Sequence, residues 1–466
     1  MAGGLLRRKP IATADGAGVA LARTLSWPHL LALGVGAIVG TGILTLIGVG
    51  ADRAGPAVLL SFVAAGAICA CAALCYAEMA SAIPISGSAY AYSYAVLGEA
   101  IAWVVGWSLI LEYSLVVSTV AVGWSGYAVA FLKGMGIAVP KSLAAGPALG
   151  GVLNLPAVAI IAVVAGMLML GTRESARVNA ALVALKIATL ALFVAVALPR
   201  FDVVNLHPFA PFGFGSVAGA DGVKRGVMGA AAIVFFAFYG FDAISTAAEE
   251  TKRPERDLAI GIVGSMLACT VIYLLVGAAA IGAVPFARLG ASPEPLALIL
   301  RELGRPGVAT LVAAAAAVAL PTVLLAFLYG QSRIFLALAR DGFLPAGLAR
   351  VSARGVPVRI TAVTATLVAA IAALVPLDVI ASLANAGTLA AFIAVAASVL
   401  VMRRRDPAMP RPFRVPAAWV VAPAAILGCA YLFTSLQAVT QQAFLGWNLI
   451  GLAIYLLYAR RRAVMA

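Results

Sequence analysis

Two apolar stretches contain residues that could interrupt a helix and expose backbone groups to a ligand. The first, residues 34–43, holds four glycines, and each glycine inside a helix costs about 1 kcal/mol relative to alanine. The second, residues 236–243, places Gly240 two positions before Asp242. An interrupted helix leaves N–H groups unpaired and presents the positive end of the next half-helix, and together these can bind a carboxylate.

The two stretches occupy corresponding places, since each lies in the first apolar span of one half of the chain. Paired interruptions are typical of substrate sites in secondary transporters, where unwound backbone needs a ligand or water as partner. The alternative is that the glycines only allow close helix packing, but the paired placement favours a binding site. The residues expected to bind substrate are Ile38, Gly40, Thr41, Gly42, Ile43, Phe236, Ala237, Phe238 and Gly240.

Three ionisable residues lie within apolar stretches. Lys186 is expected to have a function, because a lysine at the centre of a membrane helix costs about 2.5–3.5 kcal/mol; a side chain that extends to the membrane surface is the alternative. Glu112 is predicted to carry a proton or bind a substrate amine, with a structural hydrogen bond between helices as the alternative. Asp242 is predicted to hold the second interruption by accepting N–H bonds, as a helix cap does.

The composition indicates a membrane protein. The chain is 64% hydrophobic and 11% charged, with a mean hydropathy of +1.07, whereas soluble domains are about 45–50% apolar and 25% charged. The net charge is +14, but the basic residues lie in short loops, where they set orientation in the membrane rather than bind nucleic acid. The five cysteines are expected to act as small apolar residues without metal or disulfide roles.

Apolar runs predict an all-α polytopic membrane protein with twelve transmembrane helices, since about 20 apolar residues cross a bilayer. We expect an N-terminal cytoplasmic segment at 1–28, a transporter core at 29–402 and two additional helices within 416–460. The predicted spans are 29–50, 56–80, 100–132, 152–171, 175–198, 226–248, 258–284, 307–332, 357–375, 379–402, 416–437 and 443–460.

The distribution of Lys and Arg predicts the orientation. Basic residues are more frequent in the loops that face the cytoplasm if both termini lie there, as expected for inner loops. Residues 1–28 are polar and basic, without the apolar stretch of a cleavable signal, so the first span is expected to remain. We therefore expect a multi-pass protein of the cell's inner (plasma) membrane with cytoplasmic termini.

Five motifs are spread along the chain: the glycine-rich residues 36–43, Leu111-Glu112-Tyr113, residues 236–242, residues 245–257 with the pair Glu249 and Glu250, and residues 383–389. Together they resemble the amino acid-polyamine-organocation superfamily, specifically its cationic amino acid transporter branch. The similarity covers nearly the whole chain, with departures at Arg253, where asparagine is usual, and Ala259, where proline is frequent.

This resemblance implies a LeuT-like fold of five plus five inverted helices, with repeats at about 29–198 and 226–402 and two extra C-terminal helices. It implies α-amino acid substrates bound between spans 1, 3, 6, 8 and 10, with Phe236 as a gating aromatic. It also implies that the ammonium of Lys186 takes the place of a sodium ion between spans 1 and 8, near Thr322. Lys186, Glu112 and Thr322 are therefore the residues expected to couple transport to protons.

The sequence thus favours secondary active transport of amino acids by proton-coupled symport, with an amino acid exchanger or a transporter-like sensor as alternatives. An enzyme is not expected, because neither His29 nor His207 belongs to a catalytic constellation. The expected partners are an amino acid, protons and lipid, with no nucleic acid, metal or cofactor. Two questions stay open: whether the substrate is cationic or small and neutral, and whether the protein is a monomer or joins a small membrane subunit.

Overall fold

The computed structural model describes residues 7–8, 25–85, 87–170, 176–248, 251–290, 292–350, 352 and 357–460. Most of the predicted N-terminal segment at 1–28 lies outside the described residues, as do Glu249 and Glu250.

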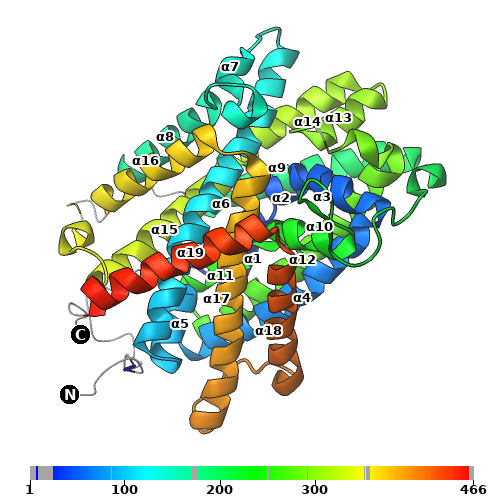
Figure 1. The fold of residues 1–466 in the computed structure, drawn as a ribbon. Coiled ribbons are helices and arrows are strands. Elements are labelled where there is room, and N and C mark those ends of the chain that lie inside the picture. Colours follow the sequence, from blue (N-terminus) through cyan, green and yellow to red (C-terminus); the bar gives the residue numbers. More distant parts are fainter. Residues whose placement is uncertain are drawn as a thin grey trace.

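The described chain is mostly helical (Figure 1). A short hairpin of β1 (Val217–Ala218) and β2 (Lys224–Arg225) lies in the loop before α10. The α-helices are α1 (Trp27–Ile38), α2 (Thr41–Leu44), α3 (Leu46–Ala54), α4 (Val58–Ala82), α5 (Ser88–Val96), α6 (Glu99–Gly134), α7 (Lys141–Ala144), α8 (Leu155–Leu170), α9 (Ala176–Ala197), α10 (Val227–Val234), α11 (Phe241–Ser245), α12 (Pro254–Ala283), α13 (Pro295–Glu302), α14 (Pro306–Ala319), α15 (Pro321–Arg340), α16 (Val358–Leu374), α17 (Leu377–Arg405), α18 (Ala418–Ser435) and α19 (Ala438–Ile454).

Among the described residues, ten helical segments are long and apolar enough to cross a membrane, and α8 and α16 are shorter apolar helices. Each predicted span overlaps one of these segments, which is the pattern of a polytopic membrane protein. The count of twelve crossings and the inverted repeat stay predictions.

Two local features differ from the predicted spans. The predicted span at 307–332 covers α14 and the first part of α15, and the helix breaks at Pro321 between them, because proline has no N–H group and its ring collides with the preceding turn. The helix α5 was not predicted, since its nine residues are too short to form a span.

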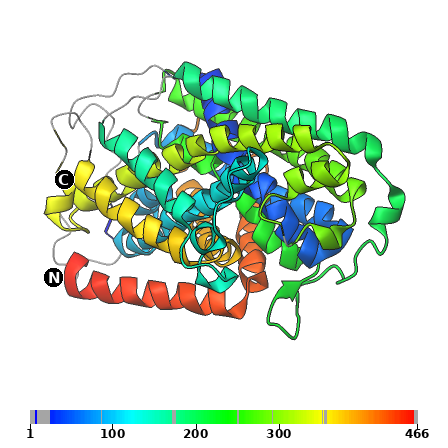
Figure 2. The ribbon, with the colours of Figure 1, turned by 90° about the horizontal axis from the view of Figure 1, so that it is seen from above.

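The interrupted segments lie in the interior of the bundle. The helix α17 runs through its centre and packs against α4, α6 and α18 (Figure 1). In the apolar part of Val227–Ser245, 89% of the residues are buried, whereas in that of Ala438–Ala459 only 22% are buried. The second view shows the segment Ala438–Ala459 along the outside of the bundle (Figure 2).

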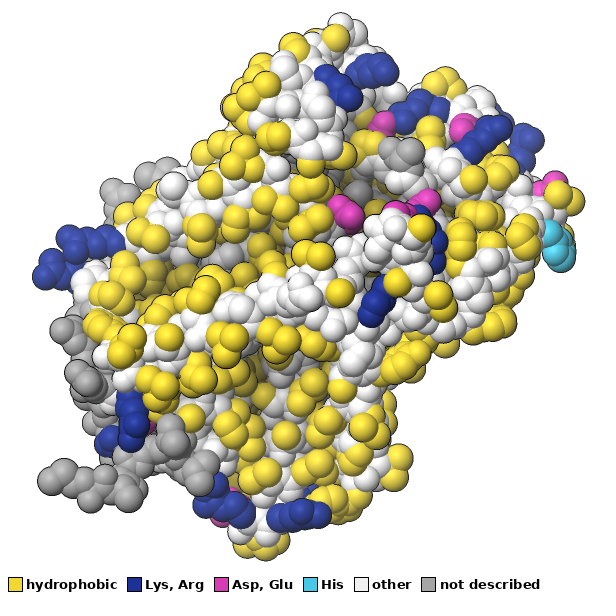
Figure 3. All heavy atoms as spheres, viewed as in Figure 1, with side chains coloured by type: hydrophobic (Ala, Val, Ile, Leu, Met, Phe, Trp, Pro, Cys, Tyr) yellow, Lys and Arg dark blue, Asp and Glu magenta, His cyan; other side chains and the backbone are white. Residues whose placement is uncertain are grey.

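The surface matches a lipid environment. Lys and Arg side chains gather towards the ends of the bundle, and much of the face between them, over α16 and α19, is apolar (Figure 3). Large apolar side chains such as Leu449 (68% exposed) and Leu457 (73% exposed) lie uncovered. Bilayer lipid is the solvent in which such a surface is stable.

Both described ends of the chain contact the start of α6. The backbone N–H of Glu99 donates to the carbonyl oxygen of Arg7 at 2.8 Å, and the Tyr455 hydroxyl donates to Glu99 Oε1 at 2.9 Å. These ends therefore lie on the same side of the bundle. That this side faces the cytoplasm stays a prediction.

The loop between α9 and α10 ties together the ends of α3 and α10 that point away from the interruptions. Gly226 N donates to Arg53 O at 2.8 Å.

Within the hairpin, two hydrogen bonds from the Arg225 guanidinium are the main reason that the pKa of Asp221 is lowered to about 2.

A buried ion pair joins α4 to the end of α17. Arg403 donates from Nε to Glu78 Oε1 at 2.9 Å and from Nη2 to Oε2 at 2.5 Å. Val415 N donates to the same Oε2 at 2.7 Å, and Arg411 Nε lies 3.6 Å from Oε1. The Glu78 side chain is fully buried, so these partners replace the water that it has lost.

Replacing Glu78 by glutamine is expected to destabilise the protein, because removing one partner of a buried ion pair costs about 3–5 kcal/mol. Thermal unfolding of the purified protein measures this as a lower Tm. The control is Glu302→Gln, whose partner Arg288 has a side chain that is 63% exposed; exposed pairs contribute about 0–1 kcal/mol. Equal melting temperatures for the two variants would contradict the prediction.

Candidate functional site

The first predicted helix interruption is present. The helix α1 ends at Ile38 and α2 begins at Thr41. Only the backbone of Thr41 is described. The first backbone hydrogen bond of α2 runs from Leu44 N to Gly40 O at 3.2 Å. The amides of residues 41–43 therefore have no partner within their own helix, as expected at a helix start.

The second interruption is also present, between α10 and α11. After α10 the chain tightens into a 3₁₀ turn, Phe235–Phe238, that holds the predicted site residues 236–238. Tyr239 is extended, and Gly240 has φ 114°. Glycine is the residue that adopts this left-handed conformation without strain, so Gly240 allows the chain to re-enter a helix at Phe241.

The two interruptions lie directly against each other. A Cβ atom added to Gly42 would lie 2.2 Å from Ala237 Cα, and one added to Gly240 would lie 2.8 Å from the carbonyl carbon of Ala37. These glycines therefore permit close packing, which was the alternative explanation for them. The helices are nevertheless interrupted at both places, so close packing and interruption occur together.

Tyr273 on α12 connects the two interruptions. Its hydroxyl oxygen lies 2.7 Å from Ile38 O and 2.7 Å from Ala237 O. Both carbonyls are at helix ends, where helical hydrogen bonding stops. This role could not be predicted from the sequence, because a tyrosine within an apolar run is ordinarily a packing residue.

Lys186 on α9 contacts the first interruption. Its Nζ donates to Gly36 O at 2.8 Å, and the side chain is 3% exposed. Gly36 is the third residue from the end of α1, so the ammonium lies at the negative end of that helix. Thr322 Oγ1 donates to Ala319 O at 2.7 Å, beside the junction of α14 and α15; its predicted pairing with Lys186 stays a prediction.

Asn385 on α17 contacts the second interruption. Its Nδ2 donates to Ala232 O at 2.6 Å and to Ile233 O at 3.3 Å. Its Oδ1 accepts the hydroxyl of Tyr239. Asn385 belongs to one of the motifs that carried the family resemblance, but sequence reasoning assigned it no role.

Asp242 holds the second interruption through both carboxylate oxygens. Oδ1 accepts Gly240 N at 3.2 Å, and Oδ2 accepts the Tyr113 hydroxyl at 3.1 Å. The Asp242 side chain thus stabilises the backbone turn at Gly240 and joins the start of α11 to α6. The capping role of Asp242 stays a prediction, and Tyr113 is an additional partner that the sequence did not indicate.

Glu112 lies one residue before Tyr113 on α6 and is 2% exposed. It packs against Gly387 on α17, where an added Cβ would lie 3.0 Å from Glu112 Cβ. Within the described part of the chain, Glu112 Oε2 has no hydrogen-bond partner. A buried carboxylate oxygen without a partner is costly, so this atom is available to a proton or to a donor group on a ligand.

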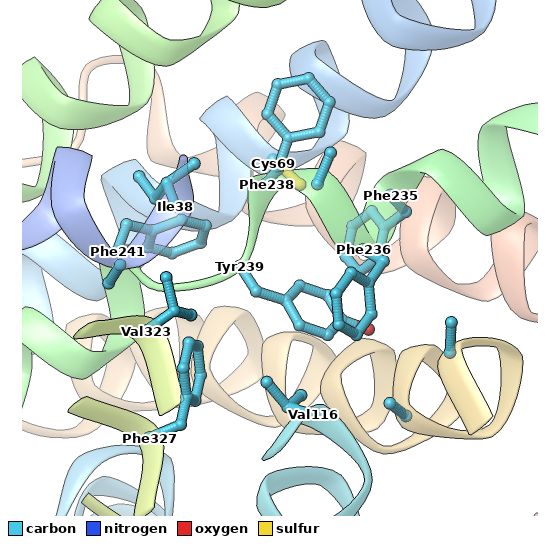
Figure 4. Close-up of a cluster of buried hydrophobic side chains, with 14 of the residues drawn as sticks. Ile38, Cys69, Val116, Phe235, Phe236, Phe238, Tyr239, Phe241, Val323 and Phe327 are labelled. Carbon is cyan, nitrogen blue, oxygen red and sulfur yellow. The ribbon is translucent and has the colours of Figure 1, made fainter. Parts of the chain in front are cut away.

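Apolar side chains surround the two interruptions (Figure 4). Val116 projects from α6, and Val323 and Phe327 project from α15 (Figure 4). The rings of Phe236 and Tyr239 lie 4.9 Å apart, centroid to centroid. The groups that could contact a bound side chain here are therefore mainly aliphatic or aromatic.

Metal ligands do not gather at this place. Across the described ranges, no group of three or more His, Cys, Asp or Glu residues could hold a metal ion. The cysteines are free, and Cys69, Cys75, Cys269 and Cys429 are buried. They pack as small apolar residues.

A family model described as amino acid permease matches residues 25–459. The chain belongs to the amino acid permease family. This permease is therefore a member of the amino acid-polyamine-organocation superfamily, as the motifs indicated, and a transporter rather than an enzyme.

The relatives of this permease have several different names. It is 45% identical to the branched-chain amino acid permease BcaP of Bacillus subtilis, over 99% of each chain. It is 40% identical to the methylthioribose transporter of Bacillus subtilis, again over 99% of each chain. It is 38% identical to the vacuolar cationic amino acid transporter 2 of Arabidopsis thaliana, over 86% of this chain and 64% of that one. Most of these names support amino acid transport.

The contact between the interruptions predicts the effect of one added methyl group. Gly42→Ala should reduce uptake in liposomes at least tenfold, because the new Cβ would overlap the backbone of Ala237. The matched control is Gly166→Ala on α8, where nothing lies within 4 Å of an added Cβ. Normal uptake by Gly42→Ala, or an equal loss in both variants, would contradict this geometry.

Proposed function

We propose that this permease carries neutral aliphatic L-amino acids across the plasma membrane by proton-coupled symport, with alternating access to a site between the two interruptions. The observation that carries the proposal is the direct contact between two interrupted helices deep in the bundle, bridged by Tyr273. Discontinuous helices that meet at the membrane midplane form the substrate sites of many secondary transporters.

The two ends of an amino acid find complementary groups at this place. The amides of residues 41–43, which begin α2, and the positive end of that helix suit a carboxylate. The carbonyl groups of Ile38 and Ala237 lie at the ends of helical segments and suit an ammonium group. The predicted residues Ile38, Gly40, Thr41, Gly42, Ile43, Phe236, Ala237, Phe238 and Gly240 are thus proposed as the substrate-binding set.

The surroundings favour an uncharged side chain on the substrate. Val116, Val323, Phe327 and Phe236 offer apolar surface next to the interruptions (Figure 4), and buried apolar contact contributes about 25 cal/mol per Å². The similarity to a branched-chain amino acid permease agrees with this choice. A cationic substrate is the second candidate, favoured by the unpartnered oxygen of Glu112, which could pair with a basic side chain.

Competition for uptake separates these substrates. In liposomes containing the purified protein, unlabelled leucine, isoleucine and valine are expected to inhibit uptake of labelled leucine at least tenfold more effectively than arginine or lysine. Stronger inhibition by arginine and lysine would favour the cationic substrate. Inhibition by methylthioribose alone would overturn amino acid transport.

Lys186 is proposed to couple transport to protons. When protonated, its ammonium stabilises the negative end of α1 through Gly36 O, and cations at a helix C-terminus contribute about 0.3–1 kcal/mol or more when partly buried. Loss of the proton weakens this interaction and frees the end of α1 to move. Glu112, the second proposed coupling residue, and Thr322 lie on α6 and α15, which both pack around the interruptions.

The variant Lys186→Ala tests this coupling. We expect it to lose accumulation driven by a proton gradient while it retains counterflow, which needs no gradient. The matched control is Lys141→Ala at the exposed start of α7. Unimpaired gradient-driven accumulation in Lys186→Ala would remove Lys186 from coupling.

The same assay distinguishes the alternative modes. Counterflow without any response to a proton gradient in the unmodified protein would identify an exchanger. A protein that binds amino acids but never accumulates them would be a sensor.

The architecture that accompanies this function is proposed as well. It consists of a core at 29–402, built from repeats at about 29–198 and 226–402, and two added helices within 416–460. The excess of Lys and Arg in one set of loops supports cytoplasmic termini.

A further inference from the structure

The end of α10 requires partners for its backbone carbonyl groups. After Val234 the chain changes from an α-helix to the 3₁₀ turn Phe235–Phe238, and the hydrogen bonds change from four residues apart to three. Carbonyl groups at this change lose their α-helical partners. In a buried position such a group must be satisfied by another donor.

Asn385 satisfies these groups and also binds the residue that follows the turn. Its amide nitrogen donates to Ala232 O and Ile233 O, at 2.6 and 3.3 Å, and its amide oxygen accepts the Tyr239 hydroxyl. The residue is fully buried. An amide provides donors and an acceptor in one side chain, so Asn385 spans the whole interruption from α10 to Tyr239.

The contact has the same form as that of Lys186. Gly36 is the third residue from the end of α1, and Ala232 is the third from the end of α10. Lys186 reaches the first from α9, and Asn385 reaches the second from α17. These two helices are the fifth and tenth predicted spans. Each half of the chain thus uses its last helix to hold the end of its first helix.

The two contacts differ in charge. An ammonium group can lose its proton, whereas an asparagine amide does not ionise. Loss of the Lys186 proton can therefore weaken the hydrogen bond to Gly36 O at the end of α1. The hydrogen bond from Asn385 to Ala232 O at the end of α10 does not change with pH in this way.

We propose that Asn385 is a positioning residue that fixes α10 and Tyr239 around the substrate, as the neutral counterpart of Lys186. This inference rests on the proposed function, since it assigns Asn385 to the same amino acid site. According to this proposal, loss of the Lys186 proton allows α1 to move. The end of α10 keeps its position at every pH, because Asn385 does not ionise.

The variant Asn385→Asp tests the inference, because it replaces a neutral amide by a carboxyl group that can ionise. A protonated aspartic acid can donate to Ala232 O and accept from Tyr239, as the amide does. An ionised carboxylate has no donor and places its charge against the two carbonyl oxygens. The variant should therefore bind substrate nearly normally in acidic buffer and more weakly as the pH rises.

The measurement is equilibrium binding of labelled leucine to purified protein, expressed as the ratio of variant to unmodified Kd at each pH. The ratio should be close to one in acidic buffer and rise at least tenfold in alkaline buffer, since a buried group left unsatisfied costs about 1–3 kcal/mol and 1.4 kcal/mol is tenfold. The ionisable groups that surround the contact are Tyr239, Glu112 on α6, Cys69 on α4 and Asp242 on α11. They are present in both proteins, so the ratio removes the part of their contribution that does not depend on residue 385.

Two further variants complete the test. Asn385→Leu removes the donor and the acceptor at every pH. It should therefore bind leucine weakly throughout, and its Kd ratio to the unmodified protein should not change with pH. The matched control is Asn448→Asp on α19, where the asparagine bonds to Ser108 and Phe444 O; its ratio should not vary with pH. Protein that fails to fold is recognised by its Tm and by the absence of recovery in acidic buffer.

The outcomes separate this inference from the proposed function. If the unmodified protein binds leucine but the ratio for Asn385→Asp does not change with pH, the role of Asn385 is wrong and the transport proposal stands. A variant that neither folds nor recovers in acidic buffer also counts against a positioning role, because the protonated side chain should suffice. If the unmodified protein binds no amino acid at any pH, the proposed function itself fails.

Discussion

The central constraint on this fold is the supply of hydrogen-bond partners to backbone groups at two interrupted helices. Lipid offers no partners, so side chains from other helices must provide them. Lys186, Tyr273 and Asn385 do so from α9, α12 and α17. The positions of these three helices around α1 and α10 follow from this requirement as much as from apolar packing.

The glycines meet two demands at once. A helix is weakened where glycine replaces residues with better helix propensity, and two backbones approach closely only where side chains are missing. Gly42 and Gly240 serve both purposes, because each faces the opposite interruption at a distance that excludes a methyl group. At these two positions the same glycine therefore allows close contact between the backbones and interrupts the helix.

Much of the architecture could be predicted from the sequence, because apolar runs and helix-breaking residues act locally. The glycine-rich stretch and Gly240 marked both interruptions, and Lys186 stood out because an ammonium in an apolar run is costly. Tyr273 and Asn385 could not be assigned in this way. Their importance comes from the carbonyl groups that they meet in three dimensions, more than 140 residues away along the chain for Asn385, and no local pattern encodes such a meeting. The break between α14 and α15 at Pro321 lies within a continuous apolar run and is likewise absent from the predicted spans.

The bridge made by Tyr273 has a property that its geometry alone determines. A phenolic hydroxyl carries a single hydrogen, yet two carbonyl oxygens lie at the same distance of 2.7 Å from it. A linear hydrogen bond can form with only one of them at a time, and rotation about the C–O bond of Tyr273 moves the hydrogen towards the other. The two halves of the molecule thus compete for one proton donor, and either can be favoured without displacing any heavy atom.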